Sequence, residues 1–225
     1  MFPSPLFRDR VEAGAILGRR LGGEIEDSGV VVLALPRGGV PVGFEIAHAL
    51  HAELDVFLVR KLGAPGREEL AMGAIASGGI RVLNEDIIRE LRIPNEAVER
   101  ATAREREEIA RRERLYREGR PAAAIEGRTA VLVDDGLATG ATMLAAARAV
   151  RLRSPRRLVV AVPVASPQAC EDFREQVDQV FCLTTPQPFY AVGAWYEDFA
   201  QTTDAEVREL LERAAHERVG RGGTA

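Results

Sequence analysis

The chain has 225 residues, of which 46% are hydrophobic and 28% charged, and 30 basic against 34 acidic side chains give a formal net charge of -4. These values are typical of one globular domain with a full hydrophobic core, and they give no electrostatic basis for nucleic-acid binding. No apolar run approaches the ~20 residues of a membrane span, and the first residues lack the apolar centre of a signal peptide, so we expect a cytoplasmic protein that binds no membrane.

The first part of the chain predicts a strand with a helix on either side of it. The apolar positions of residues 7–21 predict an amphipathic helix, and residues 29–36 predict a strand that is buried on both faces. An Arg-Gly-Gly loop at residues 37–39 and a helix over residues 41–51 follow. A glycine loop that leads into a helix can hold a phosphate, and Arg37 adds a positive charge to it. The same residues could instead form an ordinary tight turn.

The middle of the chain carries a basic pair and then a long charged segment. Residues 54–60 predict a strand that ends at Arg60 and Lys61, where the two cations would face an anion or form a solvated turn. Residues 68–84 predict a β-hairpin. Residues 95–120 predict a long exposed helix that lies on this domain or on a second subunit.

Two adjacent carboxylates follow a third predicted strand. Residues 129–133 are apolar and largely β-branched, Asp134 and Asp135 come next, and a small-residue loop at 138–142 leads into a helix over residues 142–151. The loop amides, two threonine hydroxyls and the helix dipole can hold a phosphate, whereas carboxylates repel one. A ligand with a phosphate at one end and vicinal hydroxyls nearby, such as a ribose 5-phosphate, suits both groups.

The strand and helix pattern continues after this loop. Residues 157–164, 167–176 and 179–183 predict a strand, a helix and a strand, which together with the preceding elements indicate a parallel, doubly wound sheet. Cys170 and Cys182 lack the C-x-x-C spacing, and in a cytosolic protein we expect them to be reduced thiols and not a disulfide.

The segment VLVDDGLATGAT at residues 131–142 closely resembles the 5-phosphoribosyl 1-pyrophosphate (PRPP) motif of the type I phosphoribosyltransferases. In that family the acidic pair bonds the ribose 2- and 3-hydroxyls, so the resemblance implies that Asp134 and Asp135 bind ribose. The implied 5-phosphate site consists of Ala138, Thr139, Gly140, Ala141 and Thr142. The implied pyrophosphate site, whose first loop often contains a cis peptide in the family, consists of Arg37, Gly38, Gly39, Arg60 and Lys61.

The resemblance also implies a fold and a reaction. The fold is a single α/β domain over residues 1–225, with a doubly wound, mainly parallel sheet at about 30–183, a charged helical insertion at about 84–120, and a C-terminal hood and helix at about 184–218. The reaction moves the 5-phosphoribosyl group from PRPP to a nitrogenous base or similar acceptor and releases pyrophosphate, with Mg²⁺ carried by PRPP near the acidic pair. The implied catalytic residues are Asp134, Asp135, Arg37 and Lys61.

The acceptor is the part of the reaction that the sequence does not determine. The family's hood binds the acceptor, commonly against an aromatic ring, so Phe189, Tyr190 and Trp195 are candidates unless this cluster only packs the last helix onto the sheet. Members that use 6-oxopurines have an aspartate in place of Ala138, which disfavours a 6-oxopurine here. The alternative to an enzyme is a regulatory protein that senses PRPP or a nucleotide without turnover. In both cases we expect small-molecule ligands and a homodimer or larger homo-oligomer.

Overall fold

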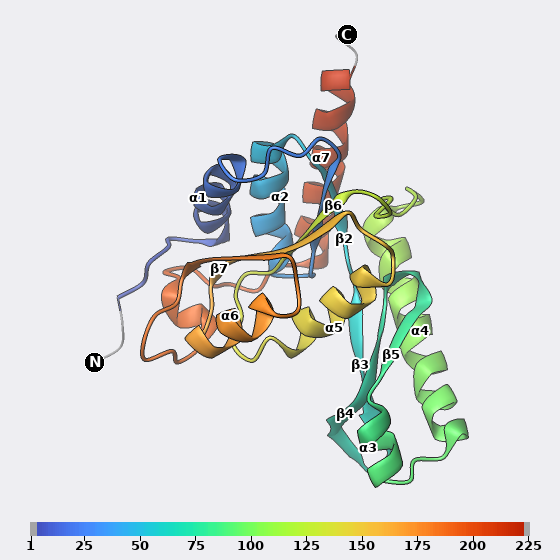
Figure 1. The fold of residues 1–225 in the computed structure, drawn as a ribbon. Helices are drawn as coiled ribbons and strands as arrows, with labels where there is room; N and C mark the ends of the chain where they lie inside the picture. The colour runs from blue at the N-terminus through green and yellow to red at the C-terminus, as the bar shows by residue number, and fades with distance from the viewer. Residues whose placement is uncertain (1–3, 223–225) are drawn as a thin grey trace.

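The computed structural model describes residues 4–222, and within them the side chains of residues 4–218. Its centre is a five-stranded sheet in the order β2-β1-β6-β7-β8, in which all neighbours are parallel. Helices cover both faces (Figure 1), so the predicted doubly wound α/β fold is confirmed. The strands are β1 (Val30–Ala34), β2 (Glu53–Val56), β6 (Thr129–Val133), β7 (Arg157–Val164) and β8 (Gln179–Thr184).

The two strands that carry the predicted site are fully buried. Successive side chains of a strand point to opposite faces, so Val31 and Leu33 pack with the helices on one face, whereas Val30 and Val32 pack with the helices on the other. The covering helices are α1 (Arg10–Gly22), α2 (Gly39–Leu50), α5 (Ala141–Arg151), α6 (Pro167–Arg174) and, beside α2, α7 (Asp204–Gly222). None of the helices within residues 4–222 has both the length and the hydrophobicity that a membrane-spanning helix needs.

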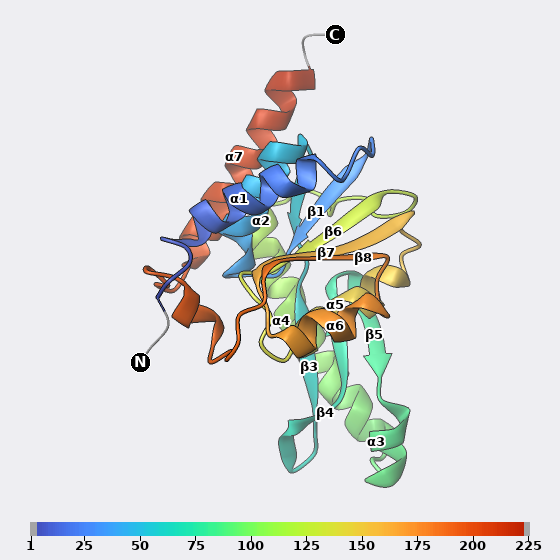
Figure 2. The same cartoon turned by 60° about the vertical axis from the view of Figure 1, so that its left-hand side comes forward.

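A second, antiparallel sheet in the order β3-β4-β5 extends away from the central sheet (Figure 2). Its last two strands are the predicted hairpin. The predicted long helix is present as α4, and its buried apolar residues face the second sheet and α7. The elements of this part are β3 (Val59–Ala64), β4 (Arg67–Ala76), β5 (Ile80–Leu83), α3 (Glu85–Glu90) and α4 (Asn95–Arg117).

The single strand predicted over residues 54–60 is wrong, because two strands of different sheets share this segment. The chain leaves the central sheet at Leu58, whose amide donates to Ser77 Oγ at 3.0 Å and whose carbonyl accepts from the Ser77 amide at 2.8 Å. This contact turns the chain toward the hairpin. Arg60 and Lys61 therefore lie inside the second sheet and not at the carboxyl end of a central strand.

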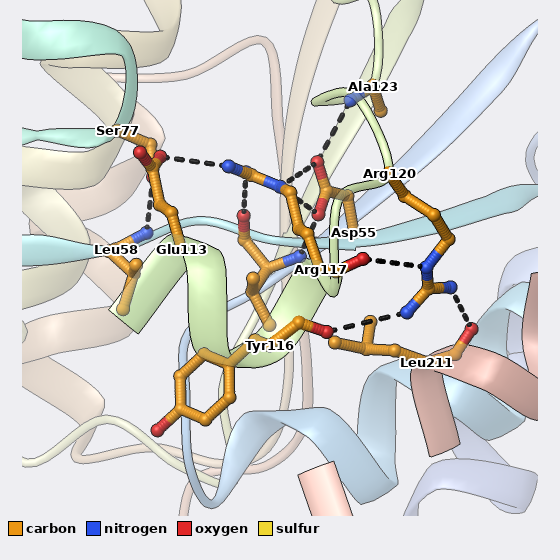
Figure 3. A network of polar contacts seen from close by, with 10 residues as sticks. Asp55, Leu58, Ser77, Glu113, Tyr116, Arg117, Arg120, Ala123 and Leu211 are labelled. Atoms are coloured by element: carbon orange, nitrogen blue, oxygen red, sulfur yellow. Dashed lines mark hydrogen bonds and ion pairs between the residues drawn. The ribbon is translucent and has the colours of Figure 1, made fainter. Parts of the chain in front are cut away.

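A buried ion pair fastens α4 to the central sheet (Figure 3). Arg117 Nε donates to Asp55 Oδ1 at 2.9 Å, and Arg117 Nη2 donates to the Val56 carbonyl at 3.0 Å. Glu113 Oε1 lies 2.9 Å from Arg117 Nη1, and the second Asp55 oxygen accepts from the Ala123 amide at 2.9 Å. Both charged side chains are thus surrounded by partners. Because α4 packs on the second sheet, this network joins the two sheets.

The two cysteines form a disulfide, so the expectation of reduced thiols is wrong. Cys170 lies on α6 and Cys182 on β8, and α6 packs against this edge strand. Their Cα atoms are 6.6 Å apart, within the span that a disulfide bridges. The sequence spacing alone did not show that the helix turns these two positions toward each other.

Candidate functional site

The loops that follow β1 and β6 pack against each other at the carboxyl edge of the central sheet. A Cβ built on Gly39 would lie 2.7 Å from the Val133 carbonyl oxygen, and one built on Gly38 would overlap the Asp135 carboxylate. Only glycine allows this approach. The peptide bond before Arg37 is cis, as the resemblance implied. The Arg-Gly-Gly loop therefore lies directly on the acidic pair.

Asp134 and Asp135 are largely buried at the end of β6. Asp134 Oδ1 accepts a hydrogen bond from the Asp135 amide at 2.9 Å, and Asp135 Oδ2 accepts one from Arg10 Nε at 2.8 Å. Burial, reinforced by the neighbouring Asp135 charge, raises the pKa of Asp134 well above its usual value. Burial also raises the pKa of Asp135, and Arg10 opposes that shift. The pair is therefore suited to a ligand that donates hydrogen bonds to it.

Residues 138–142 form an open segment that consists of a short loop and the first two residues of α5. They line a cavity of about 190 Å³ together with Asp134 and Val192. Ser166 Oγ donates to the Ala138 carbonyl at 2.9 Å and holds the start of the loop. Within the described chain, the first three amides of the loop donate to no protein group. Open amides at the N-terminus of an 11-residue helix can bind an anion.

Gly140 gives this loop its shape, and alanine there is expected to destabilise the fold. Its φ is +71°, and an added Cβ would lie 2.6 Å from Phe173 Cε2. The left-handed conformation costs other residues about 1–2 kcal/mol, and the crowding adds to that cost. In urea unfolding, Gly140→Ala should therefore lose more stability than Gly127→Ala, whose φ is +69° and whose Cβ would meet nothing within 4 Å. Equal losses would show that the Phe173 ring moves aside freely.

The predicted pyrophosphate cations do not converge in this structure. Each has a carboxylate partner: Arg37 Nη1 lies 3.8 Å from Asp204 Oδ1, Arg60 Nε 2.8 Å from Glu105 Oε2, and Lys61 Nζ 3.1 Å from Glu69 Oε2. Lys61 and Thr142 nevertheless line one cavity of about 240 Å³ between the second sheet and α5. The structure thus brings Lys61 to the edge of the open loop, whereas Arg60 points to α4.

The candidate acceptor-binding aromatics have three different environments. Trp195 is 6% exposed and packs with Phe7 and Tyr196 in a buried cluster, and Phe189 packs partly against the same cluster. Tyr190 is 60% exposed. Trp195 therefore packs the hood against Phe7, α1 and the end of β7, and it does not pack the last helix onto the sheet as the alternative expected. Of the three candidates, Tyr190 is the ring that is open to solvent.

The chain is similar to known proteins over nearly its whole length. Residues 11–197 match the family described as "Phosphoribosyl transferase domain". A Mycobacterium tuberculosis protein named "Putative phosphoribosyl transferase" is 46% identical over 209 residues, which cover 93% of this chain and 47% of that protein. The chain thus spans about half the length of the curated relatives it matches.

Solved structures show the same similarity. The crystal structure of TT1426 from Thermus thermophilus is 49% identical, covers 92% of this chain and 98% of its own, and has a TM-score of 0.83. A protein from Neisseria gonorrhoeae with bound ppGpp is 12% identical, covers 95% of this chain and 98% of its own, and has a TM-score of 0.53. The second likeness concerns the fold alone.

Proposed function

This chain belongs to the phosphoribosyl transferase domain family, and we propose that it transfers the 5-phosphoribosyl group from PRPP to a nitrogenous base or similar acceptor and releases pyrophosphate. The observation that carries this proposal is the cavity that Asp134 shares with the open loop at 138–142. A carboxylate beside an anion-binding loop suits one ligand that has both a diol and a phosphate.

Each part of PRPP has a partner in this arrangement. The loop amides and the N-terminus of α5 bind the 5-phosphate. Asp134 and Asp135 accept hydrogen bonds from the ribose 2- and 3-hydroxyls. The loop at residues 37–39 packs on the acidic pair, which supports the proposal that it binds the pyrophosphate on C1. This order along the sheet edge supports PRPP over inorganic phosphate alone as the ligand.

The chemistry needs electrostatic stabilisation and no covalent nucleophile. As the bond from ribose C1 to pyrophosphate breaks, positive charge grows on the sugar and negative charge on the leaving group, while the acceptor nitrogen supplies the electron pair for the new bond. The buried carboxylates stabilise the sugar charge, and Arg37 and Lys61 stabilise the leaving group.

A divalent cation fits the same place. The carboxylates of the acidic pair are the hard oxygen atoms that Mg²⁺ prefers, whereas the described residues hold no cluster of three or more metal-binding side chains. We therefore propose that Mg²⁺ arrives with PRPP and neutralises part of the pyrophosphate charge.

To reach the pyrophosphate, Lys61 has to break its ion pair with Glu69. Both side chains are open to solvent, so their ion pair is weak, and breaking it costs little free energy. We expect Lys61→Ala to raise the Kd of PRPP and of pyrophosphate in calorimetry and to leave the Kd of ribose 5-phosphate unchanged. Arg89→Ala, which removes another exposed ion-paired cation of this part of the chain, is the control. If the Kd of none of the three ligands changes, Lys61 is a solvated surface residue and does not bind the leaving group.

A screen of acceptors tests the proposed function. The protein is incubated with PRPP, Mg²⁺ and one free base at a time, and pyrophosphate release is followed. We expect release with at least one base and little with hypoxanthine or guanine, because Ala138 cannot take a proton. Absence of release with every base, together with tight PRPP binding, would instead indicate a PRPP-sensing regulatory protein.

A further inference from the structure

One cation reaches the acidic pair from the far end of the sequence. Arg10, the first residue of α1, lies 125 positions before Asp135, and its Nε donates to Asp135 Oδ2 at 2.8 Å. Its Nη1 donates to the Ala200 carbonyl at 2.8 Å, and its guanidinium carbon lies 3.9 Å from the centroid of the Phe199 ring. One guanidinium thus contacts the end of β6 and the hood together.

The pair that Arg10 forms is largely shielded from water. The side chains of Arg10 and Asp135 are 11% and 16% exposed. Among the described residues, Arg10 is the only basic side chain that forms an ion pair with Asp135. The charges of Asp134 and Asp135 oppose each other, which helps to raise the pKa of Asp134. Without Arg10, a partly buried carboxylate would therefore stand beside a second one with no cation to hold it.

The hood reaches the same aspartate by a second route. Tyr196 Oη donates to the Asp135 carbonyl at 2.6 Å, and the Tyr196 and Phe199 ring centroids are 5.1 Å apart. Arg10 also borders the Arg-Gly-Gly loop at residues 37–39 (the glycine loop), because a Cβ built on Gly38 would lie 3.3 Å from Arg10 Nε. Arg10 therefore lies where the glycine loop, the acidic pair and the hood meet.

We propose that Arg10 is a positioning residue of the sugar site, which orients the Asp135 carboxylate toward the ribose and holds the segment around Phe199 over it. This inference rests on the proposed function. Arg10 acts through Asp135 and need not touch the substrate. Its donor geometry also explains why lysine is a poor substitute, since one ammonium cannot serve Asp135 and Ala200 and also stack on a ring.

The test compares ligand affinities of Arg10→Met, which keeps an unbranched apolar stem and removes the guanidinium group with its charge and donors. By calorimetry with PRPP and Mg²⁺, the Kd of PRPP should rise about tenfold or more, as for loss of a charge-assisted hydrogen bond. The Kd of inorganic phosphate should stay unchanged, because the loop at 138–142 is intact. Arg20→Met on the same helix, where the arginine pairs with Glu24 at the surface, should leave both values unchanged.

A double-mutant cycle separates positioning from a structural role. If Arg10 acts through Asp135, Arg10→Met should add little to the PRPP Kd of Asp135→Asn. Fully additive effects, or an equal loss of phosphate affinity, would overturn the inference. If Arg10→Met does not fold, Arg10→Lys replaces it. We then expect a smaller rise in the Kd of PRPP, and an unchanged Kd would contradict the inference. A wild-type protein that fails to bind PRPP would instead overturn the proposed function itself.

Discussion

Arg117→Met is expected to lower the free energy of unfolding by about 3–5 kcal/mol, the range for a buried ion pair that loses one partner. The substitution leaves Asp55 buried with only amide donors and removes the donor to the Val56 carbonyl. The side-chain exposures of 11% for Arg117 and 9% for Asp55 show that both groups are largely shielded from water. Urea unfolding measures the loss.

A neighbouring arginine provides the control for this prediction. Arg114→Met changes an exposed residue of the same helix and should alter stability little. The double variant Asp55→Leu/Arg117→Met should be more stable than the sum of the two single losses predicts, because it does not leave a buried Asp55 carboxylate without its cation. Similar stabilities of Arg114→Met and Arg117→Met would show that the network contributes little to the attachment of α4.

Asp135→Asn is expected to raise the Kd of PRPP by about 10–100-fold. A hydrogen bond to a charged acceptor is worth about 1.5–3 kcal/mol, and the neutral amide also loses the ion pair with Arg10. Ribose 5-phosphate should lose affinity in parallel because it has the same diol. Inorganic phosphate should bind as before, because the amides at 138–142 are unchanged. Calorimetry with the three ligands separates these effects.

Asp172→Asn, an exposed change on α6, is the matched control for Asp135→Asn. It removes one exposed negative charge outside the acidic pair and should leave all three affinities unchanged. If Asp135→Asn weakens inorganic phosphate as much as PRPP, the aspartate shapes the loop and does not bind the sugar.

The parts of the fold that depend on local pattern could be predicted from the sequence. Residues 129–133 and 157–164 were predicted as strands and match β6 and β7, because continuous apolar runs with turn residues at their ends have few other solutions. The break near Leu58 could not be predicted, because the apolar run continues through it and the turn depends on Ser77, 19 residues later.

In the site, too, the features that depend on local sequence could be predicted, whereas those that depend on distant contacts could not. The acidic pair and the loop at 138–142 are contiguous in sequence, and the structure places Asp134 and the loop around one cavity. Arg10 gave no signal, because a helix pattern does not reveal which distant carboxylate its first residue contacts. Trp195 was a candidate because the family's hood binds the acceptor against an aromatic ring, and only packing shows that its ring is buried. Lys61 was expected at the carboxyl end of a central strand and lies inside the second sheet, although it lines one cavity with Thr142.

Equilibrium binding of PRPP with Mg²⁺ by calorimetry tests the central claim most directly. The acidic pair, the open loop and the glycine loop would each contact a different part of this ligand. PRPP should therefore bind more tightly than ribose 5-phosphate, and ribose 5-phosphate more tightly than inorganic phosphate, with one site per chain. Failure to bind PRPP, or equal affinity for PRPP and inorganic phosphate, would contradict the account.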